Sequence, residues 1–143
     1  MTSWYVMSQQ ITETQVAGER VISENNRLVG AAVRYRGKTY VDSGHPMAWN
    51  LAREDKDFGE EIEGIYQSGL DGLLDLKRWE GFMTTEGFVK TREEATEVAR
   101  RAGQLKSDVP QGHALRSEDV KDWAPPSAVV QSALHNCTFR RTS

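Results

Sequence analysis

One predicted helix start combines the residue types that would bind a phosphate or a nucleotide. Thr91 opens the pattern Thr-Arg-Glu-Glu, in which the Thr91 hydroxyl can accept from the Glu94 N–H and the Glu94 carboxylate can return to the N–H of Thr91. The first turn of such a helix has free N–H groups and a partial positive charge, which favour an anion. Arg92 lies in this turn, and aromatic rings beside it could stack a nucleobase. The pattern predicts a nucleotide-binding site at the start of this helix.

The other candidate ligand-binding residues are aromatic or basic and lie near the ends of predicted elements. They are Arg34 and Arg36 in a first strand, His45 and Trp49 at the start of a helical segment, and Phe82 and Phe88 in a second β element. The alternative for these residues is structural, with the aromatic side chains in the core and the arginines on the surface. The sequence leaves both interpretations open.

The sequence predicts no catalytic residue, no cofactor and no metal site. A metal site needs several His, Cys or carboxylate ligands, but the histidines at 45, 113 and 135 are far apart and form no ligand motif. No nucleophile motif, dinucleotide fingerprint or phosphate-binding loop is present. His45, before Pro46, could serve in acid–base chemistry with Glu80, or simply occupy a turn.

Composition narrows the possible partners. The chain has 143 residues, enough for one domain, and carries 18 basic and 21 acidic residues for a net charge of −3. Without a basic excess, we expect no binding of long nucleic acid, and no apolar run approaches the ~18–20 residues of a membrane helix. Cys137 is the single cysteine, which excludes an intrachain disulfide and favours a reducing compartment.

The elements that must position the candidates indicate an α+β fold. Residues 28–42 predict a β-hairpin that turns at Gly37, because apolar residues alternate before it. In that alternation Val29, Ala31, Val33 and Tyr35 fall on one face, and Ala32, Arg34 and Arg36 on the other. Further strands are expected near 79–89, and helical segments within 46–68.

A capped helix over residues 92–102 is the clearest helical prediction. Ala95, Val98, Ala99 and Ala102 form its apolar stripe, and Gly103 supplies a left-handed stop. We therefore expect a small antiparallel sheet with this helix against it. The predicted organisation is an N-terminal extension at 1–26, one α+β domain at 27–123 and a C-terminal tail at 124–143.

Several motifs in this order resemble a family of small phage and prophage proteins that includes the first-described Thoeris anti-defence proteins. The motifs are GAAVRYRG at 30–37, GH at 44–45, EGFMT at 80–84, GFV at 87–89, REEA at 92–95, AGQL at 102–105 and LRSEDV at 115–120. The resemblance covers residues 28–120. The sequence departs from the family pattern in Pro46–Trp49, which is less polar, in lacking an arginine before Phe88, and in having Thr91 where relatives carry Asp or Asn.

The resemblance implies a sponge that sequesters an immune signal in the cytoplasm of an infected bacterial host. The signal would be of the cyclic ADP-ribose type or a cyclic oligonucleotide, and it would be held without turnover. Such proteins form dimers or larger homo-oligomers with shared pockets. The resemblance places Phe82, Thr91, Arg92 and Ala95 near the pocket, with Arg116 on its other side. The departures above bear on ligand identity more than on fold.

Two other functions remain open at this point. The protein could be an interaction module that inhibits a host or phage factor, with the tail at 124–143 as the contact. It could also be a nucleotide-cleaving enzyme that uses His45 and Glu80.

Overall fold

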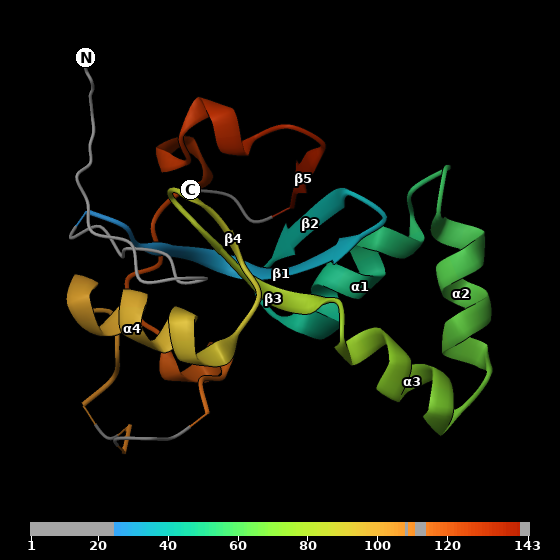
Figure 1. Ribbon diagram of the computed structural model, residues 1–143, viewed down its shortest axis with the longest axis horizontal. Helices are drawn as coiled ribbons and strands as arrows, with labels where there is room; N and C mark the ends of the chain where they lie inside the picture. Colours follow the sequence, from blue (N-terminus) through green and yellow to red (C-terminus); the bar gives the residue numbers. More distant parts are fainter. Residues whose placement is uncertain (1–24, 108, 111–113, 141–143) are drawn as a thin grey trace, which may run out of the picture.

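The residues that the structure describes form a five-stranded sheet and four α-helices, which confirms the α+β class (Figure 1). The computed structural model describes residues 25–107, 109–110 and 114–140. Residues 1–24, which hold most of the predicted N-terminal extension, and His113 lie outside the described residues. The sheet order is β4-β3-β1-β2-β5. In chain order the elements are β1 (Leu28–Tyr35), β2 (Lys38–Asp42), α1 (His45–Arg53), α2 (Gly59–Gln67), α3 (Leu70–Lys77), β3 (Glu80–Thr84), β4 (Gly87–Val89), α4 (Arg92–Ala102) and β5 (Cys137–Phe139).

The predicted hairpin is present as β1 and β2, in antiparallel register. Tyr35 pairs with Lys38, and the two turn residues between them, Arg36 and Gly37, have φ values of 51° and 85°. Two positive φ angles give a turn whose twist matches that of the strands. One prediction about β1 is wrong: a register shift between Leu28 and Gly30 moves Val29 to the face of Ala32. A β-bulge of this kind interrupts strict alternation.

The capped helix is α4, and its predicted bounds are confirmed. The Thr91 hydroxyl accepts from the Glu94 N–H at 3.1 Å, and Gly103 ends the helix with φ 72°. Its buried stripe packs on Leu28, Phe82 and Val89. Gln104, just after the helix, is buried and binds β1 through both amide atoms: Oε1 accepts from Leu28 N at 2.8 Å, and Nε2 donates to Leu28 O at 3.0 Å.

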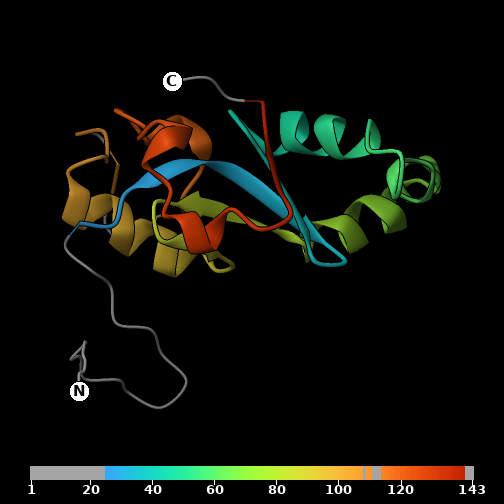
Figure 2. The same ribbon diagram turned by 90° about the horizontal axis from the view of Figure 1, so that it is seen from above.

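The predicted C-terminal tail is instead part of the fold, and the sheet is mixed rather than antiparallel. β5 pairs parallel to β2 at the sheet edge. Ala124 and Val129 are buried with Val29, Ala32 and Met83 on the sheet face opposite the helices. This apolar face needs a cover, which the Pro-containing segment supplies through short 3₁₀ turns at Pro126–Ala128 and Gln131–Ala133. The segment appears in orange and red in Figures 1 and 2.

The helices divide between the two ends of the sheet. Figure 1 shows α4 near one end and the α2–α3 pair at the other. α1 packs on β1 and β2 through Ala48, Trp49 and Ala52. Within the described residues, no helix is long and apolar enough to cross a membrane.

Candidate functional site

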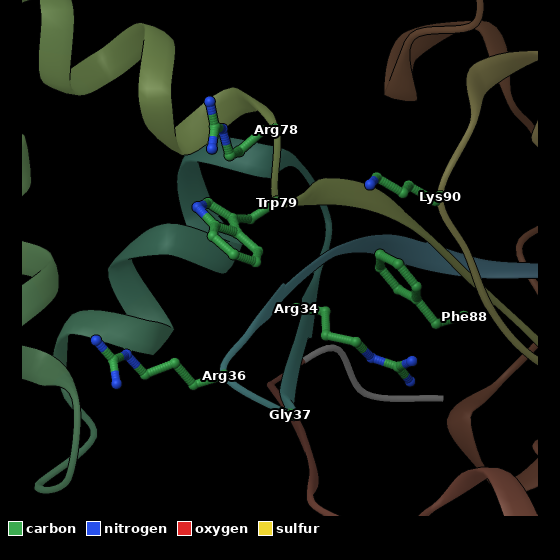
Figure 3. A pocket seen from close by; sticks show the side chains of 7 residues that line it. All are labelled: Arg34, Arg36, Gly37, Arg78, Trp79, Phe88 and Lys90. Atoms are coloured by element: carbon green, nitrogen blue, oxygen red, sulfur yellow. The ribbon is translucent and has the colours of Figure 1, made fainter.

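An open cavity of about 250 Å³ lies where the β1–β2 turn approaches the beginning of β3 and the end of β4. We call it the Trp79–Phe88 cavity. Four of its lining residues are cationic, two are aromatic and none is acidic. They are Arg34, Arg36, Gly37, Arg78, Trp79, Phe88 and Lys90 (Figure 3).

Arg34 is held in this cavity by its own strand. Its Nε donates to the Oγ1 of Thr39, its cross-strand partner on β2, at 2.9 Å, and its backbone N–H donates to Trp79 O at 2.9 Å. The guanidinium lies 4.6 Å from the centroid of the Phe88 ring. Within the described part of the chain, its terminal nitrogens have no hydrogen-bond or ion-pair partner. They extend past the Phe88 ring on the side away from Trp79 (Figure 3), where they can donate to an anion.

Phe88 owes its position to Gly81 on the neighbouring strand. A Cβ at Gly81 would lie 2.6 Å from the Phe88 Cζ and 2.3 Å from the Val89 carbonyl oxygen. Only glycine lets the ring approach β3 this closely. Phe88 is half-buried, so one part of the ring packs on the core while another borders the cavity.

Trp79 and Phe88 lie on opposite sides of the open space, and Lys90 extends toward the space between them (Figure 3). Trp79 is half-buried and is fixed edge-on to Tyr35, with ring centroids 5.5 Å apart. Lys90 is exposed, and its ammonium has no partner among the residues described. The space between two rings beside a free ammonium suits a flat, anionic ligand.

Arg36 and Arg78 complete the rim but point away from the space (Figure 3). Arg36 pairs with Glu61 at 2.8 Å, and Arg78 pairs with Asp75 at 3.3 Å. Both pairs are largely exposed, so each contributes little stability and can rearrange.

A second cavity of about 260 Å³ lies at the start of α4, where the sequence predicts a nucleotide-binding site. We call it the His45–Arg92 cavity. It is lined by His45, Lys77, Glu80, Gly81, Phe82, Lys90 and Arg92. Lys90 therefore borders both cavities. Arg92 is half-buried, donates to the Leu115 carbonyl and lies 5.9 Å from the Phe82 ring centroid.

His45 and Glu80 share this second cavity, yet each is engaged by the protein. The His45 Nε2 lies 2.7 Å from the Gly81 carbonyl oxygen, which can only accept, so Nε2 carries the proton. Burial lowers the pKa of His45 and outweighs the opposing effect of that hydrogen bond, which favours the neutral ring. The Glu80 carboxylate accepts from Trp49 Nε1 at 2.9 Å. Both side chains thus bind structural partners.

Several predicted site residues are structural. Phe82 has no exposed surface and Trp49 is 2% exposed, so neither ring can stack a base, although Phe82 closes the second cavity from the core side. Ala95 is fully buried under α4, and the Thr91 hydroxyl is used as a cap. Arg116 lies outside both cavities, 3.8 Å from Glu118. Predictions based on aromatic type alone did not separate core rings from cavity rings.

The structure brings together Arg34, Arg36 and Phe88 in one cavity and His45, Phe82 and Arg92 in the other. Sequence reasoning missed Trp79, Arg78 and Lys90, and also Lys77. One signal was present: Phe88 and Lys90 are two residues apart, a spacing that puts extended residues on the same side.

Among the described residues, no group of three or more His, Cys, Asp or Glu side chains is arranged to hold a metal ion. No family model, curated protein or solved structure matches this chain. The family resemblance and the function it implies therefore stay predictions, and the cavity geometry is the basis for proposing a function.

Proposed function

We propose that this protein binds a nucleotide, with the base between Trp79 and Phe88 and its phosphates near Lys90 or near Arg34, which lie on opposite sides of the Phe88 ring (Figure 3). The observation that carries the proposal is the Arg34 guanidinium beside the Phe88 ring, with terminal nitrogens that have no partner among the described residues, at a cavity with a second ring and no lining carboxylate. Every nucleobase has a π-face, so two rings accept it without base specificity. The Lys90 ammonium and the terminal nitrogens of Arg34, which have no partner among the described residues, then supply charge-assisted contacts to an anion.

Cavity size limits how much of the ligand is enclosed. The volume of about 250 Å³ is below the ~300–1,000 Å³ typical of pockets that enclose drug-sized ligands. One base and its adjacent phosphate fit this space, and the remainder of a larger nucleotide would extend past Lys90. Beyond Lys90 lies the His45–Arg92 cavity, where Lys77 and Arg92 offer further positive charge.

We propose further that the bound nucleotide is an immune signal of the cyclic ADP-ribose or cyclic oligonucleotide type, sequestered without turnover in an infected bacterium. This part follows from the family resemblance. It is compatible with a site that has exposed cations and rings but in which His45 and Glu80 are held by the protein itself.

Isothermal titration calorimetry with a nucleotide panel tests the binding proposal. The panel contains AMP, ADP-ribose, cyclic ADP-ribose isomers and cyclic dinucleotides, with inorganic phosphate as a ligand that lacks a base. We expect saturable binding of at least one nucleotide. Arg34→Gln and Lys90→Gln should each weaken it by about 10- to 100-fold, the loss typical of a hydrogen bond to a charged group. Arg116→Gln is the matched control, because Arg116 borders neither cavity.

Absence of saturable binding by the whole panel would remove the proposal. Equal affinities in wild type and Arg34→Gln would instead place the ligand elsewhere. To distinguish holding from cleavage, the ligand is recovered from the heat-denatured complex and measured by chromatography. Intact ligand supports sequestration, whereas conversion that stops in His45→Ala would support the cleaving enzyme.

A further inference from the structure

A third cavity lies between the β1–β2 turn, the β3–β4 turn and the C-terminal segment. Its volume is about 410 Å³, within the ~300–1,000 Å³ typical of sites that enclose a small molecule. It shares Arg34 and Phe88 with the Trp79–Phe88 cavity, and the Arg34 guanidinium lies on the side of the Phe88 ring away from Trp79 (Figure 3). We call it the Arg34–Glu86 cavity. Its other lining residues include Glu86, Ser132, Ala133 and His135.

The C-terminal segment forms a fixed wall of this cavity. Val130 N donates to Thr85 O at 2.8 Å, which joins the segment to the β3–β4 turn. Thr39 N donates to Asn136 O at 2.9 Å, which joins the segment to β2. Residues 131–135, which contribute the lining side chains, lie between these two hydrogen bonds. The segment is therefore anchored to the sheet on both sides of the residues that line the cavity.

Two opposite charges line the cavity without pairing with each other. The carboxylate of Glu86 and the terminal nitrogens of Arg34 have no hydrogen-bond or ion-pair partner among the residues described. The Glu86 backbone is held in place, because its N–H donates to Asn26 Oδ1 and Thr84 Oγ1, each at 3.1 Å. An anion alone would be attracted by Arg34 but repelled by Glu86. A molecule that carries both an anionic and a cationic group can pair with each side chain.

The remaining lining supplies hydrogen bonds and apolar contact. The Ser132 hydroxyl and the His135 ring can each donate or accept, and both residues are exposed to solvent. Phe88 and Ala133 are half-buried and offer apolar surface for the carbon atoms between the two charged groups of a ligand. Apolar surface with a few polar groups is the usual composition of a small-molecule site.

We infer that the Arg34–Glu86 cavity binds an amino acid, with the ligand's carboxylate on Arg34 and its ammonium group on Glu86. The inference is independent of the nucleotide proposal, because Glu86, Ser132 and His135 border neither the Trp79–Phe88 cavity nor the His45–Arg92 cavity. The family resemblance ends at residue 120, so it assigns no role to the C-terminal wall of this cavity.

Proton–nitrogen correlation NMR of the full chain, titrated with amino acids, tests the inference. The ligands are the standard α-amino acids together with β-alanine, γ-aminobutyrate and ε-aminocaproate, whose charged groups are progressively farther apart. We expect saturable shifts of the Gly87, Ser132 and His135 amide signals with at least one ligand. The N-acetyl derivative of that ligand lacks the ammonium group and its amide lacks the carboxylate, so each should bind at least about tenfold more weakly.

Glu86→Gln identifies the partner of the ammonium group. It should weaken binding of the amino acid at least about tenfold and leave the affinity of the N-acetyl derivative nearly unchanged, because that derivative has no positive charge to pair with Glu86. The backbone hydrogen bonds of residue 86 remain in this variant, and thermal unfolding reports whether it is folded. Glu60→Gln, exposed on α2 and outside all three cavities, is the matched control and should bind like wild type.

The absence of saturable shifts with every amino acid in the panel would overturn the inference. Equal affinities for the free amino acid and its N-acetyl derivative would also overturn it, as would a folded Glu86→Gln variant that binds the amino acid like wild type. Inorganic phosphate is titrated as an anion without a cationic group, and tighter binding of phosphate at the same amides would reject an amino-acid site. Calorimetry with nucleotides should give the same affinity in Glu86→Gln and wild type, which separates this site from the nucleotide site.

Discussion

Arg34 and Phe88 contact each other across an intervening strand, with 4.6 Å between the guanidinium carbon and the ring centroid. Arg34 lies on β1 and Phe88 on β4, while β3 runs between them. Gly81, opposite Ala32 in the ladder, is the β3 residue that the Phe88 ring approaches. The cation and the ring can meet because this position of β3 has no side chain. The cavity thus depends on a glycine that makes no ligand contact of its own in the proposed complex.

Replacing Gly81 should therefore disturb the cavity. In Gly81→Ala the new Cβ would lie 2.3 Å from Val89 O, so β4 must shift and Phe88 with it. We expect loss of both stability and nucleotide affinity, measured by thermal unfolding and calorimetry. Gly64→Ala is the control, since a Cβ there meets nothing within 4 Å on the exposed surface of α2. That substitution should stabilise the protein by about 0.5–1 kcal/mol. Unchanged affinity in Gly81→Ala would contradict this account.

The two phenylalanines predicted to bind ligand should behave differently when shortened. Phe88→Leu should weaken nucleotide binding about 5- to 100-fold, since stacking contributes ~1–3 kcal/mol per base, with a small effect on stability. Phe82→Leu should destabilise by about 1–3 kcal/mol because Phe82 is fully buried in the core beneath α4. Its affinity for the same nucleotide should be close to that of wild type. The measurements are urea unfolding and calorimetry, and a reversed pattern would reject the assignment.

Removing the α4 cap should cost stability without changing the fold. Thr91→Ala eliminates the acceptor for the Glu94 N–H, and caps of this kind contribute ~1 kcal/mol. Urea unfolding should show this decrease. Ser107→Ala, at an exposed position after the helix, is the control and should stay within about 0.5 kcal/mol of wild type. An equal effect of both substitutions would argue against the cap.

Short-range sequence patterns predicted those elements of the fold whose structure depends on neighbouring residues in the chain. The hairpin turn at Gly37 and the capped helix from Thr91 to Gly103 follow from turn chemistry, capping and periodicity, and each matches the structure. The bulge after Leu28 and the parallel pairing of β5 depend on contacts between distant segments. Gln104 illustrates the difference. The sequence places it in a polar loop, but its side-chain amide is buried and binds Leu28 of β1, which lies 76 positions earlier in the chain.

The sequence predicted which types of residue line the candidate site, but not which individual residues these are. Cations and rings were expected together, and Arg34 and Phe88 do meet. Trp49 and Phe82 are as aromatic as Trp79 and Phe88, and only tertiary packing decides which rings are enclosed. Lys90 gives no signal by itself, because an exposed lysine after a strand usually has no function.

The C-terminal segment should be required for folding. Deleting residues 124–143 removes Ala124 and Val129 from the core and β5 from the sheet edge, at a cost of several kcal/mol against a typical total of ~5–15 kcal/mol. We expect a large fall in melting temperature. Gln131→Ala, at an exposed position of the same segment, is the control and should stay within about 0.5 kcal/mol of wild type. A truncated protein that unfolds like wild type would support the tail predicted from the sequence.

Asp55 should make stability fall in acid. Its carboxylate accepts from the Tyr40 hydroxyl at 2.7 Å, the Lys38 ammonium at 3.0 Å and the Asp57 N–H at 2.7 Å. Burial opposes the charged form, but these hydrogen bonds outweigh it and lower the pKa of Asp55 from 3.8 to about 2. A carboxyl with a depressed folded-state pKa stabilises the fold above its unfolded pKa, and this stabilisation is lost as pH falls from about 4 to about 2.

The comparison of wild type with Asp55→Asn isolates this contribution. Urea unfolding is measured at pH 7, 4, 3 and 2, and the difference in unfolding free energy between the two proteins should be largest at pH 7 and shrink between pH 4 and 2. Tyr40→Phe removes one of the donors but keeps the carboxylate, so its difference from wild type should shrink over the same range by a smaller amount. A pH-independent difference for Asp55→Asn would mean that Asp55 titrates alike in the folded and unfolded chains, and that its three hydrogen bonds do not favour the charged form.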